Sequence, residues 1–410
     1  MAERSVDYLL IGGGLAAANC ARWLRDEGAD GSILVVGREP HAPYNRPPLS
    51  KGYLQGGESF EDALFRPDEW WGENDVELLT RTSVMKLDAG ARVATLSNKE
   101  EVAFDKALLA TGANVRRLRV DGADLDGIHY LRAVANSDGI REEAEKAERA
   151  VLVGGSYIGC EVAASLTSAH GVKCSIVMLE DVTFERQFGA EVGGYFQGVL
   201  EEHGIEVHGG DELERLEGED GRVSRVVTKG GLELDCDLVV IGAGVAPDVM
   251  LAKQAGLELG EAGGVKCSAC LETSVPGIYA AGDICEYDSP VHGRPIRVEH
   301  WDVAFNHGRT AALNMMGRKT EHAVVPYFFS DLADWSSMEY VGPGTGEPVI
   351  RGSLEDGDFT VFYLDGGRVT AALTVGRSDD LDHAKRFIKE SAKPDRNGLA
   401  DESTDLEGLG

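Results

Sequence analysis

A glycine-rich turn between an apolar run and a helical pattern constrains this chain most, and the chain contains it twice. The first copy reads Gly12-x-Gly14-x-x-Ala17, after the apolar residues 8–11 and before a helical pattern that ends at residue 24. In such a unit the first glycine allows the tight turn, the second lets a phosphate approach the backbone, and a small third residue lets the helix pack on the sheet. The helix N-terminus then offers unpaired N–H groups to the anion. The pattern predicts a dinucleotide-binding unit.

The second copy follows the apolar residues 150–153 and precedes a helical pattern up to residue 166. Ser156 stands where the middle glycine is usual, so a hydroxyl and a Cβ lie near the expected pyrophosphate. The next predicted strand ends in Glu180, and an acid at this place binds the adenosine ribose diol and repels a 2′-phosphate. Residues 181–185 supply no cation for such a phosphate, so this unit is predicted to bind NAD(H). Its candidate binding residues are Gly154, Gly155, Ser156, Tyr157, Ile158, Gly159, Glu180 and Gly244.

Two such units in one chain predict two dinucleotides, and FAD with NAD(H) is the simplest pair. The alternative is one working site beside a decayed repeat, although each copy keeps its strand, turn and helix in order. We therefore expect an α/β fold with two Rossmann-like domains. Beyond them, strand patterns at residues 359–364 and 369–375 and a helical pattern at 381–390 predict a C-terminal α+β domain. The polar, acidic tail from residue 393 is expected to be loosely ordered.

The charge of the chain excludes several classes of partner. With 40 Lys and Arg against 70 Asp and Glu, the 410 residues have a formal net charge of −30. A polyanion needs a basic surface, so nucleic acid and anionic membranes are not expected as partners. No stretch is long and apolar enough to span a bilayer, and no signal-peptide pattern opens the chain. We expect a soluble, cytoplasmic protein.

Metal and covalent chemistry are not predicted either. The ten His have no metal-ligand spacing, and no nucleophile motif such as Gly-x-Ser-x-Gly occurs. The seven scattered Cys fit the reduced thiols of a cytosolic protein. Cys267 and Cys270 form a Cys-x-x-Cys pair without the second pair that a zinc site needs, so incidental thiols are expected there.

Several motifs, in fixed order, resemble those of one flavoprotein family. They are residues 43–51 (PYNRPPLSK), Ala110-Thr111-Gly112, the second glycine turn with Glu161, Gly282-Asp283, residues 298–302 (VEHWD) and residues 326–331 (PYFFSD). The chain resembles the NAD(H)-dependent ferredoxin, putidaredoxin and rubredoxin reductases, a family that also holds apoptosis-inducing factor. The resemblance covers almost the whole chain and implies a fold of the pyridine nucleotide-disulfide oxidoreductase type. Its implied domains are an FAD domain of residues 1–117 and 241–320, an NAD(H) domain of residues 118–240 and a C-terminal interface domain of residues 321–410 with an acidic tail.

The resemblance also implies the site residues. Lys51 and Glu161 correspond to a pair beside the isoalloxazine, where the lysine can stabilise negative charge on the reduced flavin and the glutamate keeps the ammonium charged. Asp283 corresponds to the acid that binds the ribityl chain. Glu299 and His300 match the region near the flavin and the nicotinamide, and with Lys51 and Glu161 they are the catalytic candidates. The implied FAD-binding residues are Gly12, Gly14, Ala17, Arg38, Glu39, Arg46, Lys51, Thr111, Gly112, Asp283, Trp301 and Phe329.

The sequence leaves some of these roles open. Relatives often hold the FAD ribose with an acid after the second strand, and here either Glu39 takes the ribose or Arg38 contacts the adenine or a phosphate. His300 is either a satisfied core histidine or a catalyst, and hydride transfer itself needs stacking geometry and water exclusion rather than a protein proton donor. Phe329 is either a flavin-facing aromatic or a core phenylalanine.

The function that the resemblance implies is that of a reductase. NADH would deliver a hydride to FAD, and the flavin would pass electrons singly to a small ferredoxin or rubredoxin that feeds an oxygenase. Residues 116–119 and 294–297 are basic candidates for docking an acidic ferredoxin. The alternatives are a redox sensor of the apoptosis-inducing-factor kind and an NADH oxidase or quinone reductase. A monomer and a homodimer both fit the sequence, and a disulfide reductase is not expected because residues 41–51 contain no cysteine.

Overall fold

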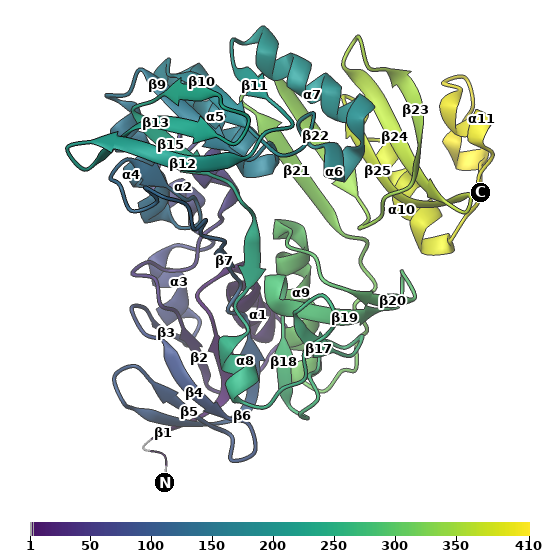
Figure 1. Ribbon diagram of the computed structural model, residues 1–410. Coiled ribbons are helices and arrows are strands. Elements are labelled where there is room, and N and C mark those ends of the chain that lie inside the picture. Colours follow the sequence, from purple (N-terminus) through teal and green to yellow (C-terminus); the bar gives the residue numbers. More distant parts are fainter. Residues whose placement is uncertain (1, 3) are drawn as a thin grey trace. The chain divides into compact units, whose positions relative to one another are not determined.

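A computed structural model describes residue 2 and residues 4–410 of the chain. These residues form two compact units, each assembled from separate stretches of sequence (Figure 1). The first unit contains the residues up to Asn45 together with Ala63–Asn114 and Ala246–Phe328. The second unit contains Arg46–Asp62, Val115–Val245 and Phe329–Gly410, so the C-terminal segment shares a unit with the second glycine turn. The short elements α2 (Phe60–Ala63), β7 (Ala113–Val115) and β16 (Val245–Pro247) lie where the chain passes from one unit to the other.

A seven-stranded sheet forms the centre of the first unit (Figure 1). Five of its strands pair in parallel in the order β3-β2-β1-β6-β18, and β5 and β4 continue from β6 as antiparallel neighbours. Leu9, Leu10 and Leu34 are fully buried, as expected of parallel strands that are covered on both faces. The strands are β1 (Arg4–Ile11), β2 (Ile33–Val36), β3 (Val76–Leu79), β4 (Val84–Asp88), β5 (Val93–Leu96), β6 (Glu101–Leu109) and β18 (Ile278–Ala280).

Two long helices of the first unit, α1 (Leu15–Asp26) and α9 (Trp301–Met315), pack directly on one another. The approach is close, because a Cβ added at Gly308 would lie 2.5 Å from the carbonyl oxygen of Ala16. This contact ties the residues at the start of α9 to the helix that follows the first glycine turn. The smaller elements of the unit are α3 (Asp68–Glu73), α8 (Met250–Gln254), the 3-10 helix η2 (Gly282–Ile284) and a sheet of β17 (Val265–Cys267), β19 (Cys285–Ser289) and β20 (Arg294–Ile296).

The second unit contains a second parallel sheet, with strand order β11-β10-β9-β15-β8. The predicted strand–turn–helix succession is confirmed in both units, as β1 followed by α1 and as β9 followed by α5. The strands are β8 (Ile128–His129), β9 (Arg149–Val153), β10 (Lys173–Val177), β11 (Glu206–His208) and β15 (Leu238–Ile241), and an antiparallel sheet adds β12 (Leu213–Glu219), β13 (Arg222–Thr228) and β14 (Glu233–Asp235). The helices are α4 (Val134–Ala144), α5 (Tyr157–His170), α6 (Glu185–Phe188) and α7 (Ala190–Glu202).

The C-terminal segment forms the five-stranded sheet β21-β22-β25-β24-β23 and a helix, so the strand and helix patterns predicted for it are confirmed. Its elements are β21 (Tyr327–Leu332), β22 (Ser336–Val341), β23 (Glu347–Ser353), β24 (Asp358–Asp365), β25 (Arg368–Val375) and α10 (Asp380–Glu390).

The loose order expected of the acidic tail is wrong. The tail forms α11 (Arg396–Ala400) and the 3-10 helix η3 (Leu406–Gly408), and Leu399 is fully buried. The guanidinium of Arg351, 6% exposed, donates to four tail carbonyls at 2.6–3.5 Å, and Arg386 donates to three more. Both arginines lie outside the tail, so the composition of the tail could not show what orders it.

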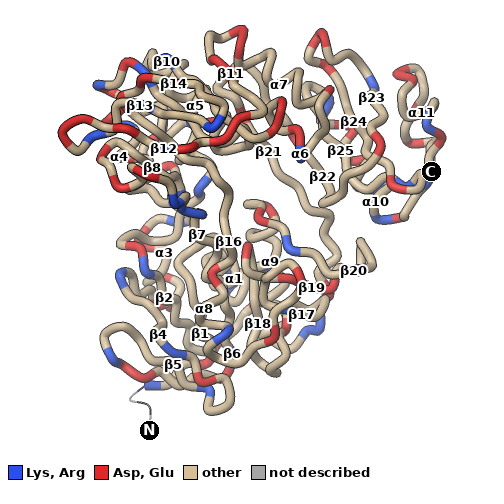
Figure 2. The backbone as a smooth tube through the Cα atoms, in the orientation of Figure 1, with Lys and Arg blue, Asp and Glu red and all other residues tan. Residues whose placement is uncertain are grey.

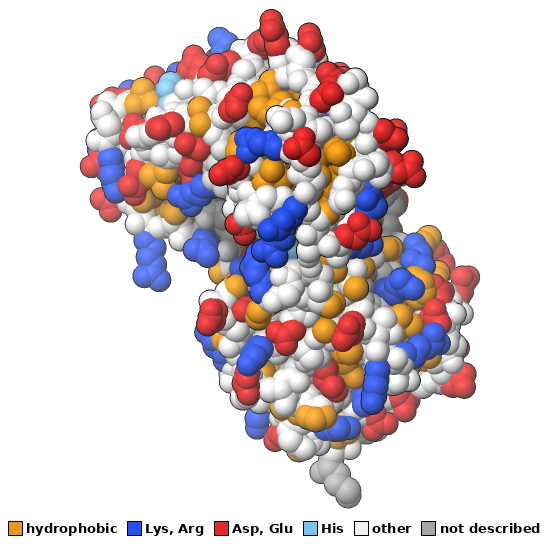
Figure 3. Space-filling model, turned by 90° about the vertical axis from the view of Figure 1, so that its right-hand side faces the viewer, with side chains coloured by type: hydrophobic (Ala, Val, Ile, Leu, Met, Phe, Trp, Pro, Cys, Tyr) orange, Lys and Arg blue, Asp and Glu red, His pale blue; other side chains and the backbone are white. Residues whose placement is uncertain are grey.

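The charged residues are distributed over both units. Figure 2 shows Asp and Glu at many turns, including the one that joins β12 and β13. On the face drawn in Figure 3, acidic and basic side chains are interspersed. Among the helices of the described residues, each is too short or too polar to cross a membrane.

Candidate functional site

The first glycine turn opens at the carboxyl end of β1. Gly12 has a φ of +131°, and a Cβ there would lie 2.1 Å from the carbonyl oxygen of Ala110, so only glycine fits. Gly14 precedes α1, and a Cβ on it would meet no atom of the described residues within 4 Å. No side chain of the part described caps this helix start. With Ala17 fully buried against the sheet, the turn presents backbone N–H groups to open space.

Residues that follow β2 and β6 flank this turn in the same unit. The Thr111 hydroxyl donates to the carbonyl of Asp248 at 2.7 Å, and the Asp248 N–H donates to the carbonyl of Gly112 at 2.8 Å. Arg38 lies 3.2 Å from the Asp248 carboxylate and also donates to Asn114 at 2.8 Å.

Glu39, the other residue left open after β2, accepts a hydrogen bond from the Tyr44 hydroxyl. Arg38 and Glu39 both contact other groups of the protein. The side chain of Arg38 is 55% exposed, whereas Glu39 is half-buried.

Asp283 lies in η2, beside a glycine with positive φ. Gly282 has a φ of +74°, and its N–H donates to Nδ1 of the buried His307 at 3.2 Å. Arg297 donates to the carbonyl of Asp283 at 3.1 Å and forms an ion pair with Glu299. The structure thus links Asp283 and Glu299 through one arginine, whose side chain is only 15% exposed.

His300 and Trp301 start α9 in the first unit. Burial lowers the pKa of His300 to about 4, although the charge of Asp283 acts in the opposite direction, so the ring is neutral near pH 7. Its Nδ1 is buried without a hydrogen-bond partner among the described residues, and its ring packs on Phe328. Trp301 donates from Nε1 to Asn45 at 2.9 Å and is 37% exposed.

The second glycine turn lies between β9 and α5 and is more crowded than the first. A Cβ at Gly154 would lie 2.6 Å from the Gly242 carbonyl oxygen, and one at Gly159 would lie 2.0 Å from that of Gly154. Ser156 precedes α5 but does not cap it, because its hydroxyl accepts a hydrogen bond from Gln187 at 3.0 Å. A Cβ at Gly155 would collide with Met178, and Gly244 has a φ of +82° after β15.

The side chains that flank the second turn are apolar. Ile158 and Leu179 are exposed by 37% and 57%, whereas Tyr157 is enclosed by the rings of Phe184 and Phe188. Burial raises the pKa of Tyr157 well above its ordinary value. Leu179 was not singled out by the sequence patterns, although it immediately precedes Glu180 at the end of the second strand region.

The prediction that Glu180 has no cation nearby is wrong. Residues 181–185 contain no cation, as the sequence indicated, but Nε of Arg186 lies 2.6 Å from Oε1 of Glu180. Arg186 stands one position beyond that window, near the start of α6, and the bends and turn of residues 181–184 bring the chain back so that its side chain reaches the acid.

Lys51 and Glu161 form a largely buried ion pair in the second unit. Nζ of Lys51 lies 2.7 Å from Oε1 of Glu161, and the side chains are 15% and 5% exposed. The hydroxyl of Ser330 donates to the same oxygen and that of Ser50 to Oε2, each at 2.5 Å. Both serines lie inside the motifs that carry the family resemblance, yet only the structure shows that they hold Glu161.

Local geometry brings Lys51 to this place. The 3-10 helix η1 (Pro47–Ser50) begins with two prolines, which fix the backbone there. Lys51 follows directly as the C-cap of this helix. Phe329 lies with its ring 5.7 Å from the Lys51 ammonium and is 37% exposed, whereas its neighbour Phe328 is buried. Arg46, at the start of η1, donates to the carbonyl of Arg132.

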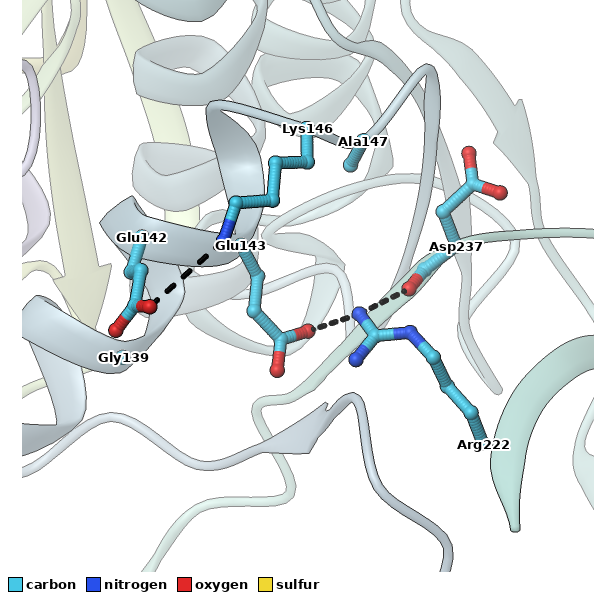
Figure 4. Close-up of a pocket in the computed structure, with 7 residues that line it drawn as sticks. All are labelled: Gly139, Glu142, Glu143, Lys146, Ala147, Arg222 and Asp237. Carbon is cyan, nitrogen blue, oxygen red and sulfur yellow. Dashed lines mark hydrogen bonds and ion pairs between the residues drawn. The ribbon is translucent and has the colours of Figure 1, made fainter. Parts of the chain in front are cut away.

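A surface pocket of about 460 Å³ lies elsewhere in the second unit (Figure 4). The guanidinium of Arg222 lies 2.6 Å from the Glu143 carboxylate and donates to the Asp237 carbonyl at 3.1 Å. Charged groups that line the pocket therefore pair with one another. The pocket contains none of the predicted site residues. Its lining residues are Gly139, Glu142, Glu143, Lys146, Ala147, Arg222 and Asp237.

All seven cysteines are free thiols, and six of them are buried, including Cys267. Cys270 is half-buried. Within residue 2 and residues 4–410, no group of three or more His, Cys, Asp or Glu side chains could hold a metal ion.

Two dinucleotide-type turns and a buried lysine–glutamate pair define a class, that of oxidoreductases working with two nucleotides. The chain belongs to the pyridine nucleotide-disulphide oxidoreductase family, which its residues 6–308 match. Residues 327–409 match the family described as reductase C-terminal. The predicted family resemblance, the α/β fold class and the class of flavoprotein reductase are confirmed. The family implies FAD and a pyridine nucleotide.

Relatives and solved structures match nearly the full length. The ferredoxin–NAD(+) reductase component of the anthranilate 1,2-dioxygenase system of Burkholderia cepacia is 32% identical, over 97% of this chain and 98% of the relative. Apoptosis-inducing factor 3 of Homo sapiens is 30% identical, over 90% of this chain and 61% of the relative. A ferredoxin reductase from Rhodopseudomonas palustris has a TM-score of 0.93, 32% identity and 98% coverage of both chains. A putidaredoxin reductase, in covalent complex with putidaredoxin, has a TM-score of 0.93, 30% identity and coverage of 99% and 98%.

Proposed function

We propose that this chain is an FAD-dependent reductase that takes a hydride from NADH and passes single electrons to a small ferredoxin or rubredoxin, which supplies an oxygenase. The Lys51–Glu161 pair is the observation that carries the proposal, because a buried cation fixed by a carboxylate is suited to stabilise a reduced flavin. The anthranilate dioxygenase component and the putidaredoxin complex support the class of acceptor.

The first unit fits FAD. The open space at Gly14 and the uncapped start of α1 accommodate a pyrophosphate, and we propose that Thr111, Gly112 and Asp283 hold the rest of the cofactor in this unit. When bound, FAD would accept two electrons from NADH as a hydride and would pass them one at a time to a one-electron carrier. We leave Arg38 and Glu39 as alternative contacts for the adenosine.

In the second unit, Lys51 supplies positive charge and Glu161 positions it. Both oxygens of Glu161 are satisfied by Lys51, Ser50 and Ser330, so the carboxylate is not left as an uncompensated buried charge. Because Lys51 also lies over Phe329, its ammonium has little freedom to leave the pair. We propose that this fixed charge is what the flavin site requires of these residues.

The second glycine turn is proposed to bind NADH, with Glu180 on the adenosine ribose diol. His300 is assigned packing and orientation rather than proton donation, because its ring is neutral near pH 7. Glu299, paired with Arg297, positions the segment beside Asp283.

The basic stretch at residues 116–119 is the better candidate for docking an acidic acceptor. Arg116, Arg117 and Arg119 are exposed. In the stretch at 294–297, by contrast, Arg297 is mostly buried and bound to Glu299. Local basic residues are needed because the chain as a whole is acidic.

The proposal is tested by NADH-driven reduction of a ferredoxin. The FAD-loaded protein is mixed with NADH and a [2Fe–2S] ferredoxin, and electron flow is followed through cytochrome c. Reduction that depends on ferredoxin and falls at high salt supports the proposal, because surface charges are screened. Fast turnover with oxygen or quinones alone points to an oxidase or quinone reductase.

A redox sensor is the second candidate function, and the match to apoptosis-inducing factor 3 favours considering it. Slow reoxidation after NADH, together with an NADH-dependent change in oligomeric state, would support the sensor and contradict the reductase. Analytical ultracentrifugation of the oxidised and the NADH-reduced protein measures that change.

A further inference from the structure

The segment that follows β10 is attached to the second glycine turn. The N–H of Phe184 donates to the carbonyl of Gly155 at 2.9 Å, and Gln187 donates to the Ser156 hydroxyl at 3.0 Å. These two contacts fix α6 beside the turn, and α6 carries Arg186. The contacts of its neighbours Phe184 and Gln187 with the turn therefore hold the backbone of Arg186 near Glu180.

The pair of Glu180 and Arg186 combines two opposite selectivities in one place. An acid at this position binds the ribose 2′-hydroxyl of NADH, whereas a nearby arginine accommodates the 2′-phosphate of NADPH. Guanidinium groups bind phosphate through paired, charge-assisted hydrogen bonds. Here the guanidinium also neutralises the carboxylate that would otherwise repel the phosphate.

The exposure of the pair shows that it can rearrange. The Arg186 side chain is 73% exposed and that of Glu180 only 25%. Because an ion pair with an exposed partner contributes little free energy, the guanidinium can turn toward a phosphate at little cost while it stays beside the carboxylate that it neutralises. Two other acids nearby, Asp181 and Glu185, oppose the phosphate, and of their carboxylates that of Glu185 accepts a hydrogen bond from the Asp181 N–H at 2.9 Å.

We propose that Arg186 is a specificity-determining residue that admits NADPH as a second hydride donor, with NADH still preferred. The inference rests on the proposed function, since it assumes that the second turn binds the pyridine nucleotide. NADH binds with its 2′-hydroxyl on Glu180, and NADPH binds with its 2′-phosphate on Arg186.

Arg186→Ala tests the proposal in the FAD-loaded protein. The ratio of kcat/KM for NADH to that for NADPH is expected to rise roughly tenfold or more, as for the loss of a hydrogen bond to a charged group. Arg186→Lys, which keeps the charge, is expected to retain most of the NADPH activity. The matched control is Arg225→Ala, which removes an exposed arginine of the same unit that pairs with Glu233 and Asp235 and should leave the ratio unchanged.

A binding measurement gives a readout that does not depend on turnover. Calorimetric titration with adenosine 2′,5′-bisphosphate and with AMP compares the affinity for the 2′-phosphate directly. Arg186→Ala is expected to weaken the bisphosphate roughly tenfold relative to AMP. Glu180→Gln should strengthen the bisphosphate, and the double variant should lose that gain.

The outcomes separate this inference from the proposed function. In one outcome the wild-type protein binds AMP and is reduced by NADH, but Arg186→Ala changes the ratio of kcat/KM for NADH to kcat/KM for NADPH by less than threefold. This outcome overturns the inference about Arg186 and leaves the proposed function intact. An equal loss of both nucleotides in Arg186→Ala also overturns the inference, because Arg186 would then only support the loop. A wild-type protein that binds neither AMP nor NADH contradicts the proposed function itself.

Discussion

Neither glycine turn has a side-chain cap on the helix that follows it in the described residues, but at the second turn the segment of α6 is hydrogen-bonded to Gly155 and Ser156. Gly14 has no neighbour where its Cβ would be, while Ser156 already shares its hydroxyl with Gln187. A ligand at either turn meets helix N–H groups that no side chain of the described residues caps, and a ligand at the second turn must in addition accommodate the contact of Gln187 with Ser156.

This difference accords with two different kinds of nucleotide. A cofactor that stays bound through every cycle is best served by an open, rigid turn, and a nucleotide that must leave after each hydride transfer is served by weaker binding. The comparison therefore predicts that the first turn governs flavin content and that the second governs nucleotide exchange.

The largest expected effect is that of Gly12→Ala. The new Cβ would lie 2.1 Å from a backbone carbonyl oxygen at a φ of +131°, so the turn must distort. We expect the purified variant to lose most of its flavin and to unfold several degrees earlier, and the ratio of absorbance at the flavin and protein bands measures this. A fully yellow, equally stable variant would show that this turn does not hold FAD.

Lys51→Ala should affect the reaction and leave the cofactor in place. Removing the ammonium takes away the charge beside the proposed flavin site, and we expect reduction by NADH to slow by roughly ten- to a hundredfold. Rapid-mixing absorbance measures the rate. Lys146→Ala is the matched control, because Lys146 is 75% exposed and pairs only weakly with Glu142 at 3.7 Å. Equal rates in the two variants would remove Lys51 from the site.

The first unit should be the more sensitive to acid. Burial lowers the pKa of His292, His300 and His322 from 6.5 to about 4, so between these values the unfolded chain binds more protons than the folded one. Stability is then lost as the pH falls from 6.5 to 4, by up to about 1.4 kcal/mol per pH unit for each of the largely buried His300 and His322, and by less for the partly exposed His292, where solvent screens the effect. Urea unfolding at several pH values measures the slope.

The same acid effect can be assigned to one unit and to one residue. Amide exchange should accelerate more in β1 and β6 than in β9 and β15 as the pH is lowered through this range, after correction for intrinsic rates. His292→Asn should reduce the slope by less than the share of a buried histidine. A slope that is flat, or equal exchange in both units, would contradict this assignment.

The smallest expected effect is that of Ser156→Gly. It restores the usual middle glycine and removes the hydroxyl that Gln187 binds. We therefore expect KM for NADH to fall by less than about fivefold, with kcat preserved. Gln187→Ala should act in the same direction. A loss of kcat in Ser156→Gly would mean that the second turn does more than bind the nucleotide.

What could be predicted from the sequence is what depends on neighbours along the chain. The glycine turns were predictable because strand, turn and helix are consecutive, and the Lys51–Glu161 pair because each residue lies in a recognisable motif. Arg186 was missed because the bends and turn of residues 181–184 bring it back to Glu180 from one position beyond residues 181–185.

Contacts between distant segments could not be predicted in the same way. The hydroxyl of Ser330 donates to Glu161, which lies 169 positions earlier in the sequence. Arg351 donates to carbonyl groups of the C-terminal tail, and the composition of the tail does not show this contact. Such contacts depend on how sheets and helices pack, which a single sequence does not encode in any local pattern.

We propose that the two glycine turns bind FAD and NADH so that a hydride passes from NADH to FAD. Anaerobic rapid mixing of the purified protein with NADH tests this proposal most directly, through loss of the flavin absorbance. We predict a yellow protein that bleaches within a fraction of a second. A protein without flavin, or one that bleaches slowly into a persistent long-wavelength charge-transfer band, would contradict the account.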